Sequence, residues 1–114
     1  MNNTVNTNTV NKTINVKSGD VFVSSGGYGQ TNIAFYRIEK VKNKTVEITE
    51  LDKIDSHDSQ SMSGKTIPNL SAPGHNRKTV RIKISSYSGI PTFKGIWGGT
   101  YPWDGTPQFF SYWH

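Results

Sequence analysis

Apolar and polar residues alternate with a period of two over much of the chain after residue 16, which is typical of strands with one buried face. Three segments show this alternation: residues 20–24 (DVFVS), 45–51 (TVEITEL) and 78–85 (KTVRIKIS). In the last segment Val80, Ile82 and Ile84 occupy one face, and Arg81 and Lys83 occupy the other. We therefore expect an antiparallel sheet that covers an apolar core with one of its faces.

Residues 32–41 (NIAFYRIEKV) depart from this pattern because bulky side chains fall on both faces. Ile33 and Phe35 share one face, whereas Tyr36 and Ile38 share the other. A strand with two apolar faces needs cover on both sides. This segment is therefore predicted to be the central strand of the sheet.

Two polar segments flank and interrupt the expected strands. Residues 1–16 are mostly Asn and Thr with occasional Val, and they predict a disordered or loosely attached tail. Residues 52–77 are rich in Ser, Gly and Pro, and they predict a long loop within a single domain of residues 17–114. A hairpin loop is expected at residues 42–44 (KNK) and a last strand at residues 92–97 (TFKGIW). No helical periodicity occurs, so the expected fold is all-β, a small five-stranded SH3-like barrel or a strongly curled antiparallel sheet.

Charged and aromatic residues are both unevenly distributed. The chain carries a net charge of +5, and between Ser59 and Trp103 it has six Lys or Arg residues and no Asp or Glu. Nine of the thirteen aromatic residues follow residue 86. Rings stack on flat partners and cations neutralise phosphate, so this composition favours a nucleotide, a nucleic acid or an acidic protein surface as the partner. Lys residues that keep a small domain soluble explain the charge equally well.

Residues 24–36 (SSGGYGQTNIAFY) form the most distinctive local pattern. Glycines permit close approach of a ligand to the backbone, and Gln30, Thr31 and Asn32 carry groups that can read the edge of a base. The same side chains can instead satisfy backbone groups within an elaborate turn. Both interpretations stay open from sequence.

Residues 103–107 (WDGTP) form a turn by composition. Trp103 either caps the core or stacks on a ligand, and Asp104 either caps its own loop or accepts a hydrogen bond from a base. Upstream, Arg81 and Lys83 on the outer face of their strand make a basic stripe with the preceding Arg77 and Lys78. Such a stripe can follow phosphates, and it can also protect a sheet edge from aggregation.

The pattern S-S-x-G-Y-x-Q-T-N-x-x-F-Y at residues 24–36, together with W-D-G-x-P at residues 103–107, resembles a family of small proteins encoded by bacteriophages and other mobile elements. The resemblance extends from Gly19 to the C-terminus. Gly27 and Gly29 stand where related sequences commonly have Trp and Asp. The resemblance implies a phage-type accessory protein in the cytoplasm of an infected bacterium, and it brings no activity with it.

Signatures of catalysis and of metal binding are weak. The chain has no Cys, so thiolate chemistry and disulfides are excluded. Residues 63–66 (SGKT) resemble the end of a P-loop, but Ser59 stands where that motif requires Gly. Asp55, His57 and Asp58 lie in a polar segment and are expected to be solvated. We expect a protein that is not an enzyme and has no cofactor or metal, and no apolar run is long enough to span a membrane.

The leading hypothesis is that a phage-type protein binds an anionic, base-containing ligand, a nucleotide signal or a nucleic acid, and thereby counteracts host defence. The candidate site contains rings that stack on the ligand or wall its pocket (Tyr28, Tyr36, Trp97, Trp103), groups for polar edges (Gln30, Asn32, Asp104) and cations for phosphate (Arg77, Arg81, Lys83). The alternative is a protein-binding inhibitor of a host defence nuclease or complex, because Tyr, Trp and Arg also dominate protein interfaces. A homodimer would give so small a chain a deeper pocket.

Overall fold

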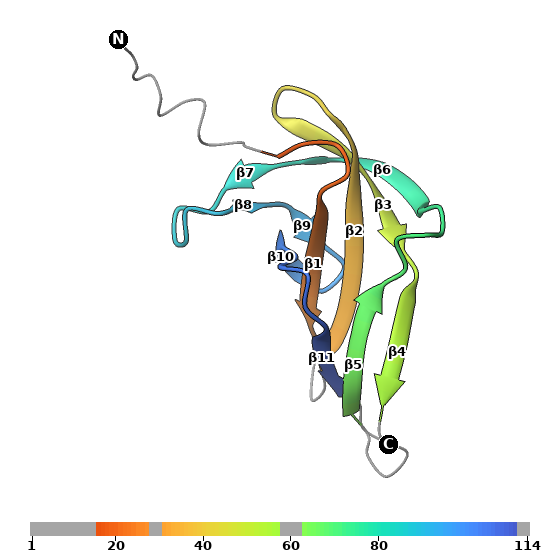
Figure 1. Cartoon of the computed structure of the whole chain (residues 1–114). Helices are drawn as coiled ribbons and strands as arrows, with labels where there is room; N and C mark the ends of the chain where they lie inside the picture. Colours follow the sequence, from red (N-terminus) through yellow and green to blue (C-terminus); the bar gives the residue numbers. More distant parts are fainter. Residues whose placement is uncertain (1–15, 28–30, 58–62, 112–114) are drawn as a thin grey trace.

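The computed structural model describes residues 16–27, 31–57 and 63–111, and all regular elements in these ranges are β-strands (Figure 1). These strands are β1 (Val21–Gly26), β2 (Asn32–Val41), β3 (Thr45–Leu51), β4 (Lys53–His57), β5 (Ser63–Pro68), β6 (His75–Arg81), β7 (Lys83–Ile84), β8 (Pro91–Thr92), β9 (Lys94–Gly95), β10 (Gly98–Pro102) and β11 (Gln108–Ser111). The expected all-β fold is confirmed. Within the same ranges no helix is long and apolar enough to cross a membrane.

Six strands form a strongly curled antiparallel sheet in the order β6-β3-β2-β1-β10-β9. β2 is central, and it pairs with β1 through Phe22 and Tyr36 and with β3 through Ile38 and Ile48. Register shifts interrupt the β2–β3 ladder after Ile38 and the β3–β6 ladder after Ile48. Irregularities of this kind increase local twist, so they help the sheet to curl.

The two edges of the curled sheet are joined at one end by a short pair of strands. β6 ends at Arg81 just before β7 begins at Lys83, and β8 ends at Thr92 just before β9 begins at Lys94. β7 and β8 pair with each other, with Lys83 opposite Thr92. We call the strip between β6 and β9 the seam, because the described residues of these two strands form no ladder with each other.

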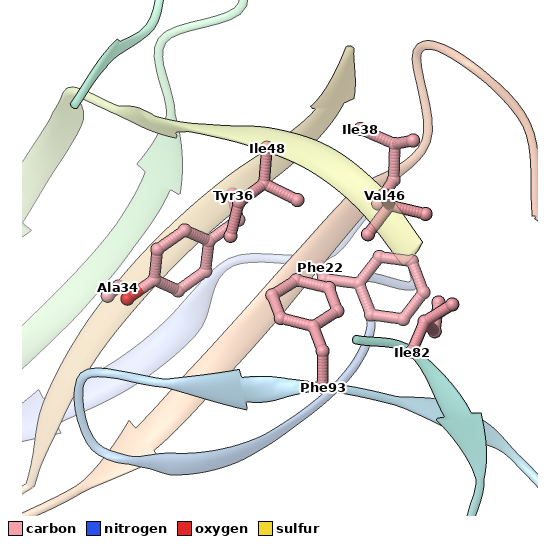
Figure 2. Packing of buried hydrophobic residues seen from close by; sticks show 8 residues of the cluster. All are labelled: Phe22, Ala34, Tyr36, Ile38, Val46, Ile48, Ile82 and Phe93. Atoms are coloured by element: carbon pink, nitrogen blue, oxygen red, sulfur yellow. The ribbon is translucent and has the colours of Figure 1, made fainter. Parts of the chain in front are cut away.

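The inside of the curl holds the main hydrophobic core (Figure 2). Its buried members are Phe22, Ala34, Tyr36, Ile38, Val46, Ile48, Ile82 and Phe93. The ring centroid of Phe93 lies 5.1 Å from that of Phe22 and 5.8 Å from that of Tyr36. Ile82 and Phe93 enter this core from the two sides of the seam, and each burial contributes roughly 1.5–3 kcal/mol. The core therefore holds the two edges together where backbone pairing is missing.

A second apolar cluster covers the opposite face of β1 and β2. Its buried members are Val23, Ile33, Phe35 and Leu51, and Val21, Trp103 and Phe110 pack against it. Phe110 belongs to a separate three-stranded sheet in the order β11-β5-β4. Lys53 Nζ in that sheet donates to the carbonyl of Ile33 over 2.8 Å. Both faces of β2 are thus buried, which confirms its predicted place at the centre.

The expectation of a long loop at residues 52–77 is wrong, because β4, β5 and the first part of β6 lie there. β4 and β5 form a hairpin in which Ile54 stands opposite Ile67. Ile54 is 50% exposed and Ile67 36% exposed, whereas the inward-facing Thr66 is 1% exposed. The hydrophobic pattern gave no sign of this hairpin because its apolar residues face outward and a threonine faces inward.

Two further details differ from the expectation. The strands expected over residues 78–85 and 92–97 are each divided in two, at Ile82 and at Phe93, so there are more than five strands. The predicted tail lies outside the described residues except for Val16, which packs against the main core.

Candidate functional site

Three cations line the seam. Arg81 ends β6, Lys83 begins β7 and Lys94 begins β9, and all three are exposed. Ile82 separates β6 from β7 and is only 2% exposed, and Phe93 separates β8 from β9 and is only 3% exposed. Because side chains alternate along a strand, burying these two residues forces their neighbours outward. Arg81, Lys83 and Lys94 all line one hollow, so the three cations share one outer surface.

A hollow of about 480 Å³ opens at this seam. Its lining consists of Arg81, Lys83, Thr92, Phe93, Lys94, Gly98 and Gly99. Gly98 has a φ of +114°, a conformation that side chains other than glycine rarely adopt. The absence of side chains at Gly98 and Gly99 leaves bare backbone at the wall. The hollow therefore combines cations, a hydroxyl, an aromatic residue and accessible backbone.

Hydrogen bonds fix the wall on the β8–β9 side. The Thr100 hydroxyl accepts from the Phe93 amide over 3.1 Å and donates to the Phe93 carbonyl over 3.0 Å. The Thr92 hydroxyl donates to the Thr100 carbonyl over 2.7 Å. Gly95 is buried, and a Cβ there would lie 2.8 Å from the Cβ of Ser24. These contacts hold Lys94 on a rigid hairpin.

The acidic side chains that form ion pairs engage cations other than Arg81, Lys83 and Lys94. Glu47 on β3 pairs with Arg77 over 2.8 Å and with Lys42 over 3.3 Å. Hydrogen bonds from Arg77 and then from Lys42 hold the pKa of Glu47 below its usual range. In the described part of the chain, no carboxylate pairs with a seam cation. The seam therefore gathers three cations around one hollow without an ion-paired carboxylate among the described residues.

Of the cations proposed for phosphate, the structure brings Arg81 and Lys83 together but sets Arg77 apart in its pair with Glu47. Lys94 joins the first two across the seam. Lys94 belongs to the basic stretch between Ser59 and Trp103, but it was not among the predicted site residues. Arg81 and Lys94 line the same hollow, which the chain forms by turning back between β7 and β8.

Tyr36 was proposed as a wall of the pocket, and this prediction is wrong. The residue is 3% exposed, and its ring packs against Phe93 in the main core. Its hydroxyl accepts a hydrogen bond from the Ile96 amide over 2.9 Å. Burial is the main cause of its raised pKa. Tyr36 therefore anchors the β9–β10 turn from inside.

Trp103 caps the second cluster, as one of its two interpretations predicted. Its ring lies 5.9 Å from Phe35 at an interplanar angle of 73°, and its Nε1 donates to the Thr106 carbonyl over 2.7 Å. It also borders a hollow of about 450 Å³, but the charged residue in that lining is Asp20. A carboxylate there disfavours an anion.

Asp104 serves its own turn. Its Oδ1 accepts from the Thr106 hydroxyl over 2.6 Å and from the Thr106 amide over 3.0 Å. The hydrogen bond from the Thr106 hydroxyl is the main cause of the lowered pKa of Asp104, and the hydrogen bond from the Thr106 amide is the next. The interpretation of Asp104 as a loop cap is the one that the geometry matches.

The remaining proposed residues belong to the glycine-rich segment and its neighbourhood. Asn32 Nδ2 donates to the carbonyl of Gly26 over 3.3 Å, so this amide satisfies backbone. Trp97 is 39% exposed, and its amide donates to Ser24 Oγ over 3.1 Å at the β9–β10 turn. Tyr28 and Gln30 lie outside the described residues.

A separate exposed feature is the outer face of the β11-β5-β4 sheet. Ile54, Ile67 and Phe109 are 50%, 36% and 55% exposed, and Phe109 stands opposite Lys65. We call this surface the apolar face. Patches of this kind commonly contact other proteins.

No family model, curated protein or solved structure matches the chain. Among the described residues there is also no group of three His, Asp or Glu side chains that could hold a metal ion. The seam is therefore the candidate site on the strength of its own geometry.

Proposed function

We propose that this protein is a non-enzymatic binding protein whose seam captures an anionic, base-containing ligand, either a nucleotide or a nucleic acid. The observation that carries the proposal is the set of three uncompensated cations around one hollow: Arg81, Lys83 and Lys94. The resemblance to phage proteins extends the proposal to an accessory protein that counteracts host defence.

The chemistry of the seam suits phosphate. A guanidinium can donate two parallel hydrogen bonds to phosphate oxygens, and an ammonium acts as a compact point charge. Arg81 offers the first kind of group, while Lys83 and Lys94 offer the second. Bare backbone at Gly98 and Gly99 lets a flat group approach closely, and the volume lies within the usual range of small-ligand sites.

The competing explanation is that these cations only protect unpaired strand edges from association with other chains. Edge protection needs charge but no ligand. The two explanations therefore differ in whether the purified protein binds anions at this surface.

The test is calorimetric titration of the protein with a dinucleotide, a nucleoside triphosphate and a 12-residue single-stranded oligonucleotide at low salt. The seam variant, Arg81→Gln/Lys83→Gln/Lys94→Gln, removes the three cations. The control variant, Lys17→Gln/Lys40→Gln/Lys44→Gln, removes equal charge from exposed positions outside the seam. We expect binding of at least one ligand to the wild type and the control, and its loss in the seam variant. Equal weakening of both variants, or no binding by the wild type, would refute the proposal.

A second candidate function, inhibition of a host defence nuclease or complex by direct contact, is favoured by the apolar face. Phe109 and Ile54 are the most exposed of its three apolar residues. Inhibition assays with purified defence nucleases would compare the wild type with Ile54→Ser/Phe109→Ser. Loss of inhibition in this variant, with the seam variant fully active, would support this candidate over the first.

A further inference from the structure

The β7–β8 hairpin carries a fully exposed aromatic ring. In Figure 1 this hairpin projects from the body of the molecule, with its loop at the far end. Tyr87 in that loop is 100% exposed, and Ile90 is 40% exposed. A ring buries 150–250 Å² when it is covered, so a ring left wholly in water retains its full capacity to bind.

The loop that displays Tyr87 is organised by its own hydrogen bonds. Ser85 Oγ accepts from the amides of Tyr87 and Ser88 over 3.2 and 3.3 Å. The Gly89 amide donates to the Ser85 carbonyl over 2.8 Å, and the Ser85 amide donates to the Ile90 carbonyl over 2.9 Å. Because the loop is already ordered, a ligand that meets Tyr87 loses little affinity to ordering the backbone.

The same hairpin connects this ring to the seam. Lys83 lies at its base, four residues from Tyr87, and strands rise about 3.3 Å per residue. Tyr87 can therefore lie up to ~13 Å from Lys83 along the hairpin. No Asp or Glu lies between Ser59 and Trp103, so the whole hairpin is free of negative charge.

This spacing distinguishes between the two ligand classes. A mononucleotide carries one phosphate and one base a single sugar away, so it cannot place separate phosphates at the three seam cations while its base contacts Tyr87. A strand with several nucleotides can place phosphates at the seam and a later base at Tyr87. A duplex offers no free base, because its bases are already stacked on each other.

We propose that Tyr87 is a stacking platform for a base of a single-stranded nucleic acid whose phosphates lie along the seam. This inference rests on the proposed function and narrows it from nucleotides in general to a strand. The ring supplies a contact that tolerates any base sequence, since every base has a π-face.

The experiment measures fluorescence anisotropy of a labelled 12-residue oligothymidylate and of an abasic chain of the same length. Wild type, Tyr87→Ala and Tyr87→Phe are compared at one low salt concentration. We expect Tyr87→Ala to weaken binding of the oligothymidylate roughly 5- to 150-fold, the range that one stacked base supplies. Its affinity for the abasic chain should equal that of the wild type, and Tyr87→Phe should bind both chains like the wild type.

The outcomes separate this inference from the proposed function. If Tyr87→Ala binds the oligothymidylate as tightly as the wild type while the seam variant does not, the stacking platform is refuted and the proposed function stands. Equal loss for the oligothymidylate and the abasic chain would also refute stacking. A mononucleotide that binds as tightly as the 12-residue strand would refute the preference for a strand. If the wild type binds none of these ligands, the proposed function fails first.

Discussion

The salt dependence of binding is the most quantitative consequence of the seam. Three cations that contact three phosphates release condensed counterions, with a slope of about −0.7 per contact for single strands. Arg81, Lys83 and Lys94 together predict a slope near −2 in a plot of log affinity against log salt. The affinity of the wild type should then fall about 20-fold between 50 and 200 mM salt.

Removing one cation should make this slope less steep by about 0.7. Arg81→Gln leaves two contacts, so its affinity should fall only about sevenfold over the same salt range. Anisotropy titrations of a single-stranded oligonucleotide at four salt concentrations give these slopes directly. The control variant with Lys17, Lys40 and Lys44 changed to Gln should keep the slope of the wild type. If Arg81→Gln and the control shift the slope equally, binding follows net charge and the seam has no special role.

Two further predictions concern the scaffold that presents the seam. Gly95→Ala places a Cβ 2.8 Å from the Ser24 Cβ and 3.0 Å from Thr100 Cγ2, so denaturant unfolding should show that the free energy of unfolding falls by about 1–3 kcal/mol. The control is Gly99→Ala, whose Cβ meets only Thr92 Oγ1 at 3.5 Å, and it should change the free energy of unfolding little. Hydrogen bonds from Thr49 and Arg37 lower the pKa of Glu39, so its contribution to stability is present above pH ~4.3 and is lost as the pH falls through its lowered folded pKa. Glu39→Gln should flatten the fall in unfolding free energy below pH ~4, and an unchanged acid slope would contradict this assignment.

The sheet could largely be read from the sequence because its strands bury side chains with regular alternation. The bulky residues on both faces of residues 32–41 correctly located the central strand, because Phe35 and Tyr36 point to opposite faces of β2. The β4–β5 hairpin could not be read, because Ile54 and Ile67 face outward and Thr66 faces inward. Periodicity locates a strand only when the apolar residues face the core.

The candidate site was only partly predictable, because closeness in sequence does not decide the face on which a ring lies. Phe93 is buried in the main core and Trp103 packs against the second cluster, whereas Tyr87 is wholly exposed at the tip of a hairpin. Arg81 and Lys94 line one hollow because the chain turns back at the β7–β8 hairpin, which the sequence pattern did not predict. The cations were visible in the sequence, but their arrangement around one hollow was not.

The most direct test of the seam is a titration of the isotope-labelled protein with a single-stranded oligonucleotide, followed by amide chemical shifts. The largest changes should fall on Arg81, Lys83, Lys94, Gly98 and Gly99, with the β7–β8 loop as the next most affected segment. Changes concentrated on the apolar face, or spread evenly over all exposed lysines, would contradict a binding site at the seam.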